Sequence, residues 1–296
     1  MALIPPFFSD TVVAIGYETQ KQKIIWGASG FFYFHTLKGD TGRVYLVTNK
    51  HVLEGNSRIY LRLNPKALDK PKGYSLDLIN PVTKEKLWKG HYFKKVDVAV
   101  IPVNFSLFQT EEMQVNFFID TKHTQDTAGM KSKGFSEGDG IFALGYPVSL
   151  IGDKSNSVIV RGGTIARIRD TFKNPLEPFL VDTTVFPGNS GGPVINKPEM
   201  ISIEGTKPVN DANLIGIIAS YVPYRDFAVS KQTGNVRVIF EENSGLSNIF
   251  TVDCIKATVI GFERTIKKSI SLAEPKASEK ALENPNITSG YNSDNL

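Results

Sequence analysis

Short runs of apolar and β-branched residues, bounded by Gly, Pro, Asn or Asp, recur through most of the chain. In residues 58–63 the apolar Ile59, Leu61 and Leu63 alternate with polar positions, which is typical of a half-buried strand. Strands of this kind are predicted at residues 11–17, 30–34, 43–48, 58–63 and 96–103, and again at 140–145, 157–168, 179–181, 193–195, 214–220 and 235–240. Two clusters of short strands predict an all-β protein with two barrels.

A polar, irregular stretch separates the two clusters, and we interpret it as the connection between the barrels. The predicted boundaries are an N-terminal barrel over about 9–103, a connection over about 104–138 and a C-terminal barrel over about 139–250. The connection contains one predicted helical turn near residues 106–113. We treat residues 1–267 as one domain.

A helical period appears only near the end of the chain. Thr251 can cap a helix over about residues 251–267. One face of that helix would carry Val252, Ile255, Val259, Phe262 and Ile266. We expect it to dock on the second barrel. Residues 268–296 are mostly Ser, Asn, Glu, Lys, Ala and Pro, so we predict a disordered tail.

Composition narrows the function classes. The 296 residues are 41% hydrophobic and 22% charged, as in ordinary globular proteins. No apolar run approaches the ~18 residues that a membrane span needs. The net charge of +4 comes without an arginine-rich block, so no nucleic-acid partner is predicted.

The single cysteine, Cys254, excludes an internal disulfide and a cysteine-based zinc site. The first residues, MALIPPFFSD, carry no basic residue before the apolar ones and do not resemble a secretory signal. Both observations favour a reducing compartment, and we expect a cytoplasmic protein.

The most specific motif is Gly188-Asn189-Ser190-Gly191-Gly192-Pro193. A serine flanked by glycines can sit on a tight turn with its hydroxyl exposed. The amides of Gly188 and Ser190 could then point together at a developing oxyanion. The structural alternative is a glycine-rich turn between two strands. Because a serine hydroxyl is a weak nucleophile alone, the motif requires a histidine base.

The order of residues decides between serine-hydrolase folds. All four histidines, His35, His51, His91 and His123, precede Ser190. The α/β-hydrolase fold needs a histidine after the serine and is excluded. A subtilisin order needs an acid before the histidine, and no acid before His51 lies in a setting suited to burial. The remaining order of His, Asp and Ser fits an all-β double barrel.

His51 is the preferred base because it follows an apolar strand and a short turn. The other three histidines are expected to be surface residues. Asp97 is the preferred acid, since a carboxylate within an apolar run is costly to bury without a hydrogen-bonding partner. Asp69 and Asp77 lie in a Lys/Pro-rich excursion and are weaker candidates.

These residues resemble the chymotrypsin-fold serine proteases, and among them the bacterial trypsin-like peptidases of the HtrA type. The resemblance covers roughly residues 11–267 and implies two antiparallel six-stranded β-barrels with a C-terminal helix. Its matching segments are Ser29-Gly30-Phe31, Leu46-Val47-Thr48-Asn49-Lys50-His51-Val52, Asp97-Val98-Ala99-Val100, Ala143-Leu144-Gly145-Tyr146-Pro147, Asp182 and Pro187-Gly188-Asn189-Ser190-Gly191-Gly192-Pro193.

By this resemblance the chain is a serine endopeptidase acting on proteins or peptides through an acyl-enzyme. His51 would be the general base, Asp97 would orient it and Ser190 would be the nucleophile. The amides of Gly188 and Ser190 would form the oxyanion hole. Neither a metal nor an organic cofactor is expected.

Two departures from the family are informative. Asn189 stands where digestive relatives carry an Asp that pairs with a new amino terminus, so activation by that route is not expected. HtrA proteins usually continue into a PDZ domain. The roughly 30 residues after the predicted helix are too few for one, so we expect none.

The resemblance also places the specificity pocket. Thr184, six positions before the nucleophile, would lie at its base, and Ala219, Ser220 and Tyr221 would pair with the substrate. With no acid at the base, we expect cleavage after small or medium apolar residues. Asp226 would be the first candidate if a basic preference were found.

Two rival functions stay open. One is a binding or regulatory module on a protease fold, latent until an activating partner or homo-oligomer orders a loop. Residues 66–91 and 105–138 are long enough for that role, although they are also typical of surface insertions. The other is an esterase with the same triad, and comparing an ester with a matched peptide would separate the two.

Overall fold

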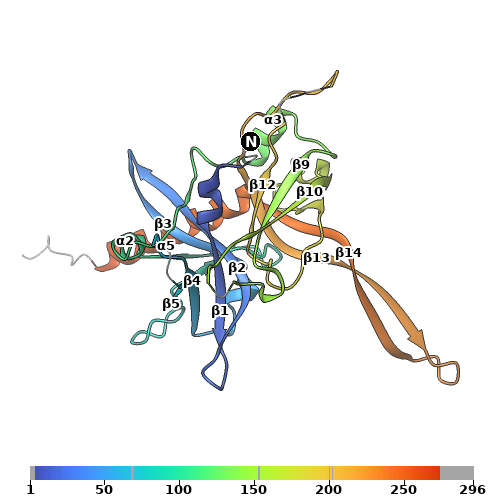
Figure 1. Cartoon of the computed structure of the whole chain (residues 1–296), viewed down its shortest axis with the longest axis horizontal. Coiled ribbons are helices and arrows are strands. Elements are labelled where there is room, and N and C mark those ends of the chain that lie inside the picture. The colour runs from blue at the N-terminus through green and yellow to red at the C-terminus, as the bar shows by residue number, and fades with distance from the viewer. Residues whose placement is uncertain (1–3, 68–69, 153, 200, 202, 274–296) are drawn as a thin grey trace, which may run out of the picture. The chain divides into compact units, whose positions relative to one another are not determined.

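The computed structural model describes residues 4–67, 70–152, 154–199, 201 and 203–273 (Figure 1). The chain divides into two compact units, residues 1–262 and 263–296. Both lobes and the candidate site belong to the first unit. Of the second unit, the description covers the last turns of the terminal helix.

The N-terminal lobe is an antiparallel sheet that curls toward a barrel. Its elements are η1 (Pro6–Thr11), β1 (Val12–Glu18), β2 (Ile24–Lys38), β3 (Thr41–Thr48), α1 (Lys50–Leu53), β4 (Arg58–Leu63), β5 (Lys72–Asp77), β6 (Lys89–Gly90) and β7 (Ala99–Pro102). The strand order is β5-β4-β1-β2-β3-β7-β6, and β8 from the connection pairs in parallel with β2. The edge strands approach each other where Leu87 N–H donates to Leu78 O at 2.9 Å.

The lobe therefore has eight strands where six were predicted. The two additional strands, β6 and β8 (Phe118–Ile119), are only two residues long and carry no alternating pattern that a sequence can reveal. The predicted all-β chymotrypsin-like class with a C-terminal helix is confirmed.

The C-terminal lobe is a closed barrel of six strands in the order β10-β11-β14-β13-β12-β9. Its elements are β9 (Gly140–Gly145), η2 (Pro147–Ser149), β10 (Ile159–Arg167), α4 (Arg169–Lys173), β11 (Phe179–Asp182), β12 (Pro193–Asn196), β13 (Leu214–Val229) and β14 (Val236–Thr251). The pairing of β13 with β14 continues past the barrel as far as Val229 and Val236. Figure 1 shows this hairpin extending away from the barrel.

The connection between the lobes is more regular than predicted. It holds α2 (Phe105–Thr110), the strand β8 and α3 (Thr127–Lys133). Asp126 caps α3 by accepting from Gly129 N at 3.0 Å, and Gly134 ends it in the left-handed region. In the part of the chain that the structure describes, no helix combines the length and apolar character that crossing a membrane requires.

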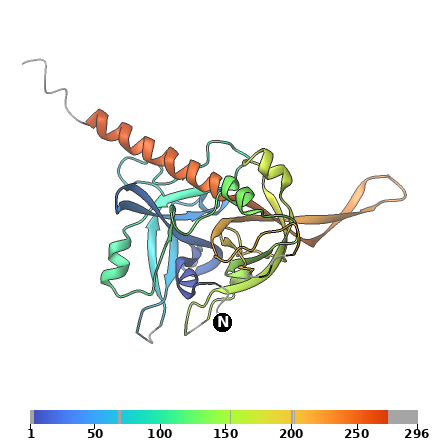
Figure 2. The ribbon, with the colours of Figure 1, turned by 90° about the horizontal axis from the view of Figure 1, so that it is seen from above.

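The helix α5 (Val252–Ala273) packs on both lobes through its first three turns (Figure 2). Its buried Val252, Ile255 and Val259 belong to one apolar cluster with residues of both barrels. The ring of Phe262 meets that of Tyr45 on β3, with centroids 5.8 Å apart. The helix therefore docks on the second barrel and on the first as well, because its apolar face continues onto the first.

Cys254 lies in the first turn of α5 and is fully buried. Its Sγ donates to Pro175 O at 3.4 Å and lies 3.8 Å from Thr251 Oγ1. Burial raises the pKa of the Cys254 thiol to about 11. The thiol is thus protonated at neutral pH.

Candidate active site

The pairing of β3 with β7 brings His51 and Asp97 together. Thr48, the last residue of β3, lies opposite Ala99, the first residue of β7. His51 follows Thr48 by three residues on the single-turn helix α1, and Asp97 precedes Ala99 by two. His51 Nδ1 lies 2.5 Å from Asp97 Oδ2. Asp97 was expected within the strand, but the strand begins after it, which frees the carboxylate to turn toward α1.

The Asp97 carboxylate is held on both oxygens. Its Oδ1 accepts from the backbone amides of Lys50 at 2.7 Å and His51 at 3.2 Å. The buried side chain of Asn49 also donates to Asp97 O at 2.6 Å. These contacts fix the carboxylate relative to the imidazole that it faces.

Electrostatics favour an ionised Asp97. Burial of the carboxyl opposes ionisation, but the hydrogen bonds and charge of His51, with the amides of α1, outweigh it and lower the pKa of Asp97 below its ordinary value. An ionised carboxylate can only accept, so His51 Nδ1 carries a proton. In the neutral imidazole, Nε2 is then the acceptor. The imidazole is 52% exposed, which leaves Nε2 accessible to a reactant.

The turn between β11 and β12 carries Ser190 in a backbone that needs glycine. Gly188 has a φ of +102° and Gly191 a φ of +86°. A Cβ at Gly191 would stand 2.1 Å from Ser29 O, and one at Gly188 would stand 2.3 Å from Tyr146 O. Both positions therefore exclude side chains on conformational and steric grounds.

Ser29 joins this turn to the N-terminal lobe. It is fully buried on β2, its N–H donates to Ser190 O at 2.9 Å and its Oγ donates to Gly188 O at 2.7 Å. The same Oγ accepts from Tyr146 N at 2.9 Å, and Ser29 O accepts from Thr48 Oγ1 at 2.8 Å. Because Thr48 is three residues before His51, Ser29 ties the serine turn to the strand that carries the histidine.

The hydroxyl of Ser190 makes no hydrogen bond to any residue that the structure describes, His51 included. Of the three predicted triad residues, the structure thus brings His51 and Asp97 into hydrogen-bonding contact, and Ser190 makes no such contact with them. In enzymes without substrate, catalytic hydrogen bonds are often long and tighten only in the reacting complex.

The directions of the backbone amides of Gly188 and Ser190 follow from the carbonyl groups of the residues before them. Pro187 O accepts from Val148 N at 2.7 Å, and Asn189 O accepts from Gly192 N at 2.9 Å. In a planar trans peptide the N–H points opposite to the C=O, so the amides of Gly188 and Ser190 face away from these donors. Neither amide has a partner among the described residues, and both can donate to an anion.

One edge of β13 is open next to this turn. Gly191 N donates to Ile218 O at 3.0 Å and Ile218 N donates to Gly192 O at 2.9 Å, after which β13 leaves β12. The next residues, Ala219, Ser220 and Tyr221, pair with β14 alone or bulge, so their other edge can accept an added strand.

The side chains predicted for the specificity pocket differ in exposure. Ala219 is buried, whereas Ser220 and Thr184 are exposed. Tyr221 donates its hydroxyl to Glu241 Oε1 at 2.8 Å on β14. Asp226 lies far out along the β13–β14 hairpin, opposite Phe240, and is exposed.

Sequence reasoning placed His91 on the surface, which is wrong. The side chain is buried, its Nδ1 accepts from Phe93 N at 3.2 Å and its ring stacks on Tyr92. Burial, and secondarily the charge of Lys50, lower the pKa of His91. His35 and His123 are half-buried, and His35 Nδ1 lies 2.7 Å from Asp120 Oδ2. The polar neighbours of His91 in the sequence concealed its burial.

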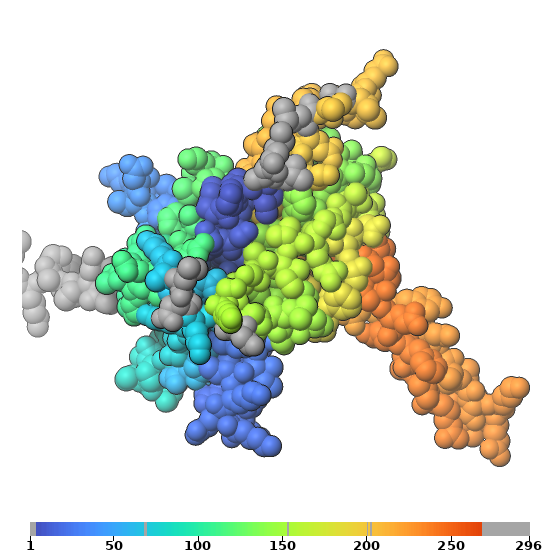
Figure 3. Space-filling model, viewed as in Figure 1, coloured from blue at the N-terminus to red at the C-terminus, as the bar shows by residue number. Residues whose placement is uncertain are grey.

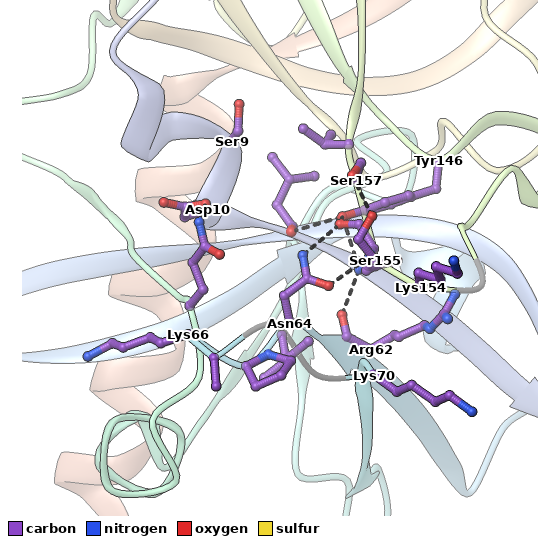
Figure 4. Close-up of a pocket in the computed structure, with 17 residues that line it drawn as sticks. Ser9, Asp10, Arg62, Asn64, Lys66, Lys70, Tyr146, Lys154, Ser155 and Ser157 are labelled. Atoms are coloured by element: carbon purple, nitrogen blue, oxygen red, sulfur yellow. Dashed lines mark hydrogen bonds between the residues drawn. The ribbon is translucent and has the colours of Figure 1, made fainter.

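A cavity of about 850 Å³ lies apart from these residues, on β4 and the loop after β9 (Figure 4). Arg62, Asn64, Lys154 and Ser155 line it, together with the ring of Tyr146. None of the predicted catalytic or substrate-binding residues lines this cavity.

The lobes, the open strand edge and the His-Asp pair define a chymotrypsin-like fold. The family model of the trypsin-like peptidase domain matches residues 28–199, and the chain belongs to this family. No curated protein matches it. Among solved structures, the HtrA-type protease AlgW with a tripeptide is similar at 16% identity over 83% of this chain and 57% of that chain, with a TM-score of 0.43.

The structure of AlgW with a decapeptide is similar at 15% identity over 87% of this chain and 64% of that chain, with a TM-score of 0.44. The chain therefore spans less than two thirds of each of these proteins.

Proposed function

We propose that the protein is a serine endopeptidase in which His51, Asp97 and Ser190 form the catalytic triad. The observation that carries the proposal is the 2.5 Å contact of His51 Nδ1 with a carboxylate that two backbone amides also hold. This arrangement leaves Nε2 of His51 free to act as a base. Ser29 contacts both the serine turn, through Gly188, and the end of β3, through Thr48, from which the chain continues to His51.

In the proposed mechanism, His51 Nε2 removes the proton of Ser190 as the hydroxyl oxygen attacks a peptide carbonyl. The amides of Gly188 and Ser190 donate to the oxyanion of the tetrahedral intermediate. Collapse breaks the C–N bond, and His51 gives its proton to the leaving amine. Water then attacks the acyl-enzyme with His51 again as base, which releases the acid and restores Ser190. Asp97 stabilises the imidazolium throughout.

The proposed substrate is an extended segment of polypeptide that pairs with the open edge of residues 219–221. The resemblance places Thr184, which carries a hydroxyl and no charge, at the base of the primary pocket, so we expect cleavage after small or medium apolar residues. Profiling with a peptide library tests this expectation. A strict preference for Lys or Arg would contradict it.

A second candidate is a latent protease-fold module that a partner activates. It is favoured by one observation, the lack of a hydrogen bond between Ser190 and His51. In that case the wild-type protein would be folded but unreactive until the partner is added.

A fluorophosphonate probe separates the two candidates, because it reacts only with an activated serine. We expect labelling of the wild type and none of Ser190→Ala or His51→Ala, with circular dichroism to show that all three are folded. Cleavage of a peptide library by the same samples would then establish a peptidase, and a matched ester would test the esterase alternative. Folded wild-type protein that is not labelled would contradict the proposal of a constitutively active enzyme.

A further inference from the structure

The outer part of the β13–β14 hairpin, residues 223–242, is a two-stranded ribbon without a third layer; we call it the arm (Figures 1 and 3). Seven of its large apolar side chains are between 49% and 59% exposed. They are Tyr224, Phe227, Val229, Val236, Val238, Ile239 and Phe240. An isolated two-stranded hairpin is marginally stable in water, and an apolar patch of this kind is typical of an interface.

The pairing of the strands defines the two faces of the arm. Phe227 lies opposite Ile239 and Arg225 opposite Glu241, so these four side chains share one face. Asp226 lies opposite Phe240 and Ala228 opposite Val238 on the other face. Each face of the arm therefore combines apolar and charged positions. A partner that packed on one face would leave the apolar side chains of the other face exposed. A partner strand that pairs with the edge instead adds neighbouring side chains on both faces.

The outer edge of β14 is complementary to itself. Two copies of this strand can pair antiparallel about a two-fold axis perpendicular to the sheet, which places residues of the same face opposite each other. Centred on Ile239, this pairing sets Val238 opposite Phe240 twice. It also brings Arg237, the bulged residue of β14 between Val236 and Val238, next to Glu241 twice. One face then carries a row of Phe227 and Ile239 followed by the partner's Ile239 and the partner's Phe227.

The charges support this register. Within the described residues, Arg237 has no ion pair or hydrogen bond through its side chain. Glu241 accepts from Arg225 Nε at 2.8 Å and from Tyr221 OH, and a carboxylate can accept further donors. Charged residues usually protect an edge strand from pairing. Here the two opposite charges lie four residues apart, so self-pairing in this register brings them together instead.

We propose that the arm is a dimerisation element: two copies of this chain join their β14 edges around Ile239 into a four-stranded sheet. Charge complementarity selects a second copy as the occupant. The proposal does not depend on catalysis by either copy. Self-pairing also explains why a ribbon with apolar side chains on both faces projects from a barrel that is closed without it.

The first test is the molar mass of the full chain by sedimentation equilibrium over a range of concentrations. We expect a reversible dimer of twice 32.7 kDa. Arg237→Glu converts two attractive contacts into repulsive ones and should raise the dissociation constant about tenfold or more. The control is Lys207→Glu, which makes the same change in net charge at an exposed site outside the arm and should leave the constant unchanged.

A monomer at all concentrations would overturn the proposal and leave the arm to a different macromolecule. A dimer that Arg237→Glu and Lys207→Glu affect equally would also overturn it, since another surface would then form the contact.

The register has its own test. Residues directly opposite in an antiparallel pair have Cα atoms about 4.5 or 5.5 Å apart, both within reach of a disulfide. Ile239→Cys should therefore give a covalent dimer on mild oxidation, reversed by dithiothreitol. Phe227→Cys is the matched control, because three strand spacings would separate its two copies by about 14 Å. The native thiol of Cys254 is buried and does not compete. Equal crosslinking of both variants would refute the register.

Discussion

Replacing Ser29 with alanine removes one buried hydroxyl that serves two backbone groups. Gly188 O loses its donor at 2.7 Å, and Tyr146 N loses its acceptor at 2.9 Å. Leaving a buried polar group unpaired costs about 1–3 kcal/mol, so with two such groups the free energy of unfolding should fall by about 2–6 kcal/mol. For a chain of this size each kcal/mol corresponds to roughly 2–4 °C, which predicts a decrease in Tm of about 4–24 °C.

The same substitution should slow catalysis. Gly188 supplies one of the two proposed oxyanion donors, and loss of such a donor costs about 10²–10³ in kcat. Ser29→Ala loosens Gly188 without removing its amide, because the bond from Ser29 N to Ser190 O remains. We therefore expect a decrease in kcat of roughly 10- to 100-fold, smaller than the loss of the donor itself.

The assay compares Ser29→Ala with wild type by thermal denaturation and by the rate of fluorophosphonate labelling or peptide cleavage. Ser57→Ala is the control, because its exposed hydroxyl makes no hydrogen bond within the described chain. An unchanged Tm would refute the energetic argument. A lowered Tm with an unchanged rate would show that Ser29 supports the fold but does not position the oxyanion donors.

Three further predictions concern the same region. Asp97→Asn should keep the fold but lower kcat by about 10⁴, measured with a peptide substrate, because the amide no longer fixes the His51 tautomer. Gly191→Ala should abolish labelling and lower Tm, since its Cβ would stand 2.1 Å from Ser29 O at a positive φ; retained labelling would contradict this. Because the pKa of His91 is lowered, native His91 stays neutral while the unfolded chain takes up a proton as pH falls through about 6.5, so stability decreases there. Denaturant titrations across that pH range should show that the free energy of unfolding depends less steeply on pH in His91→Gln than in the wild type. The same slope in both proteins would refute this prediction.

Asp97 should affect the stability of the protein at a lower pH than His91 does. Its pKa is lowered in the native state, so its contribution is present above the unfolded value near 3.8 and is lost as pH falls through the native pKa. Loss of activity between pH 7 and 5 should therefore come from a group other than Asp97.

The strand pattern was a sound guide to the barrels because a half-buried strand must alternate. The position of His51 follows from the same signal, since it stands just beyond the end of a predicted strand. Asp97 was expected inside a strand, and only the observed start of β7 at Ala99 leaves it free to turn toward His51. Ser29 had no such signal. Its hydrogen bond to Gly188 joins positions 159 residues apart, and the local sequence around neither residue predicts that bond.

The arm was also missed. Residues 214–220 and 235–240 were predicted as separate strands, whereas β13 and β14 are 16 residues each and form one hairpin. Pro223 and the charges at Arg225, Asp226 and Glu241 interrupt the apolar alternation, because the arm has no core to face. Pattern reasoning detects strands that cover a core and cannot detect a ribbon that faces solvent on both sides.

Cys254 offers a chemical reporter of how the terminal helix opens. Its thiol is buried and protonated, so alkylating reagents should reach it only when the start of α5 detaches from the segment around Pro175. The rate of alkylation under native conditions then measures the frequency of that opening directly. A chain with one silent thiol also accepts a spectroscopic label at any introduced cysteine without further substitution.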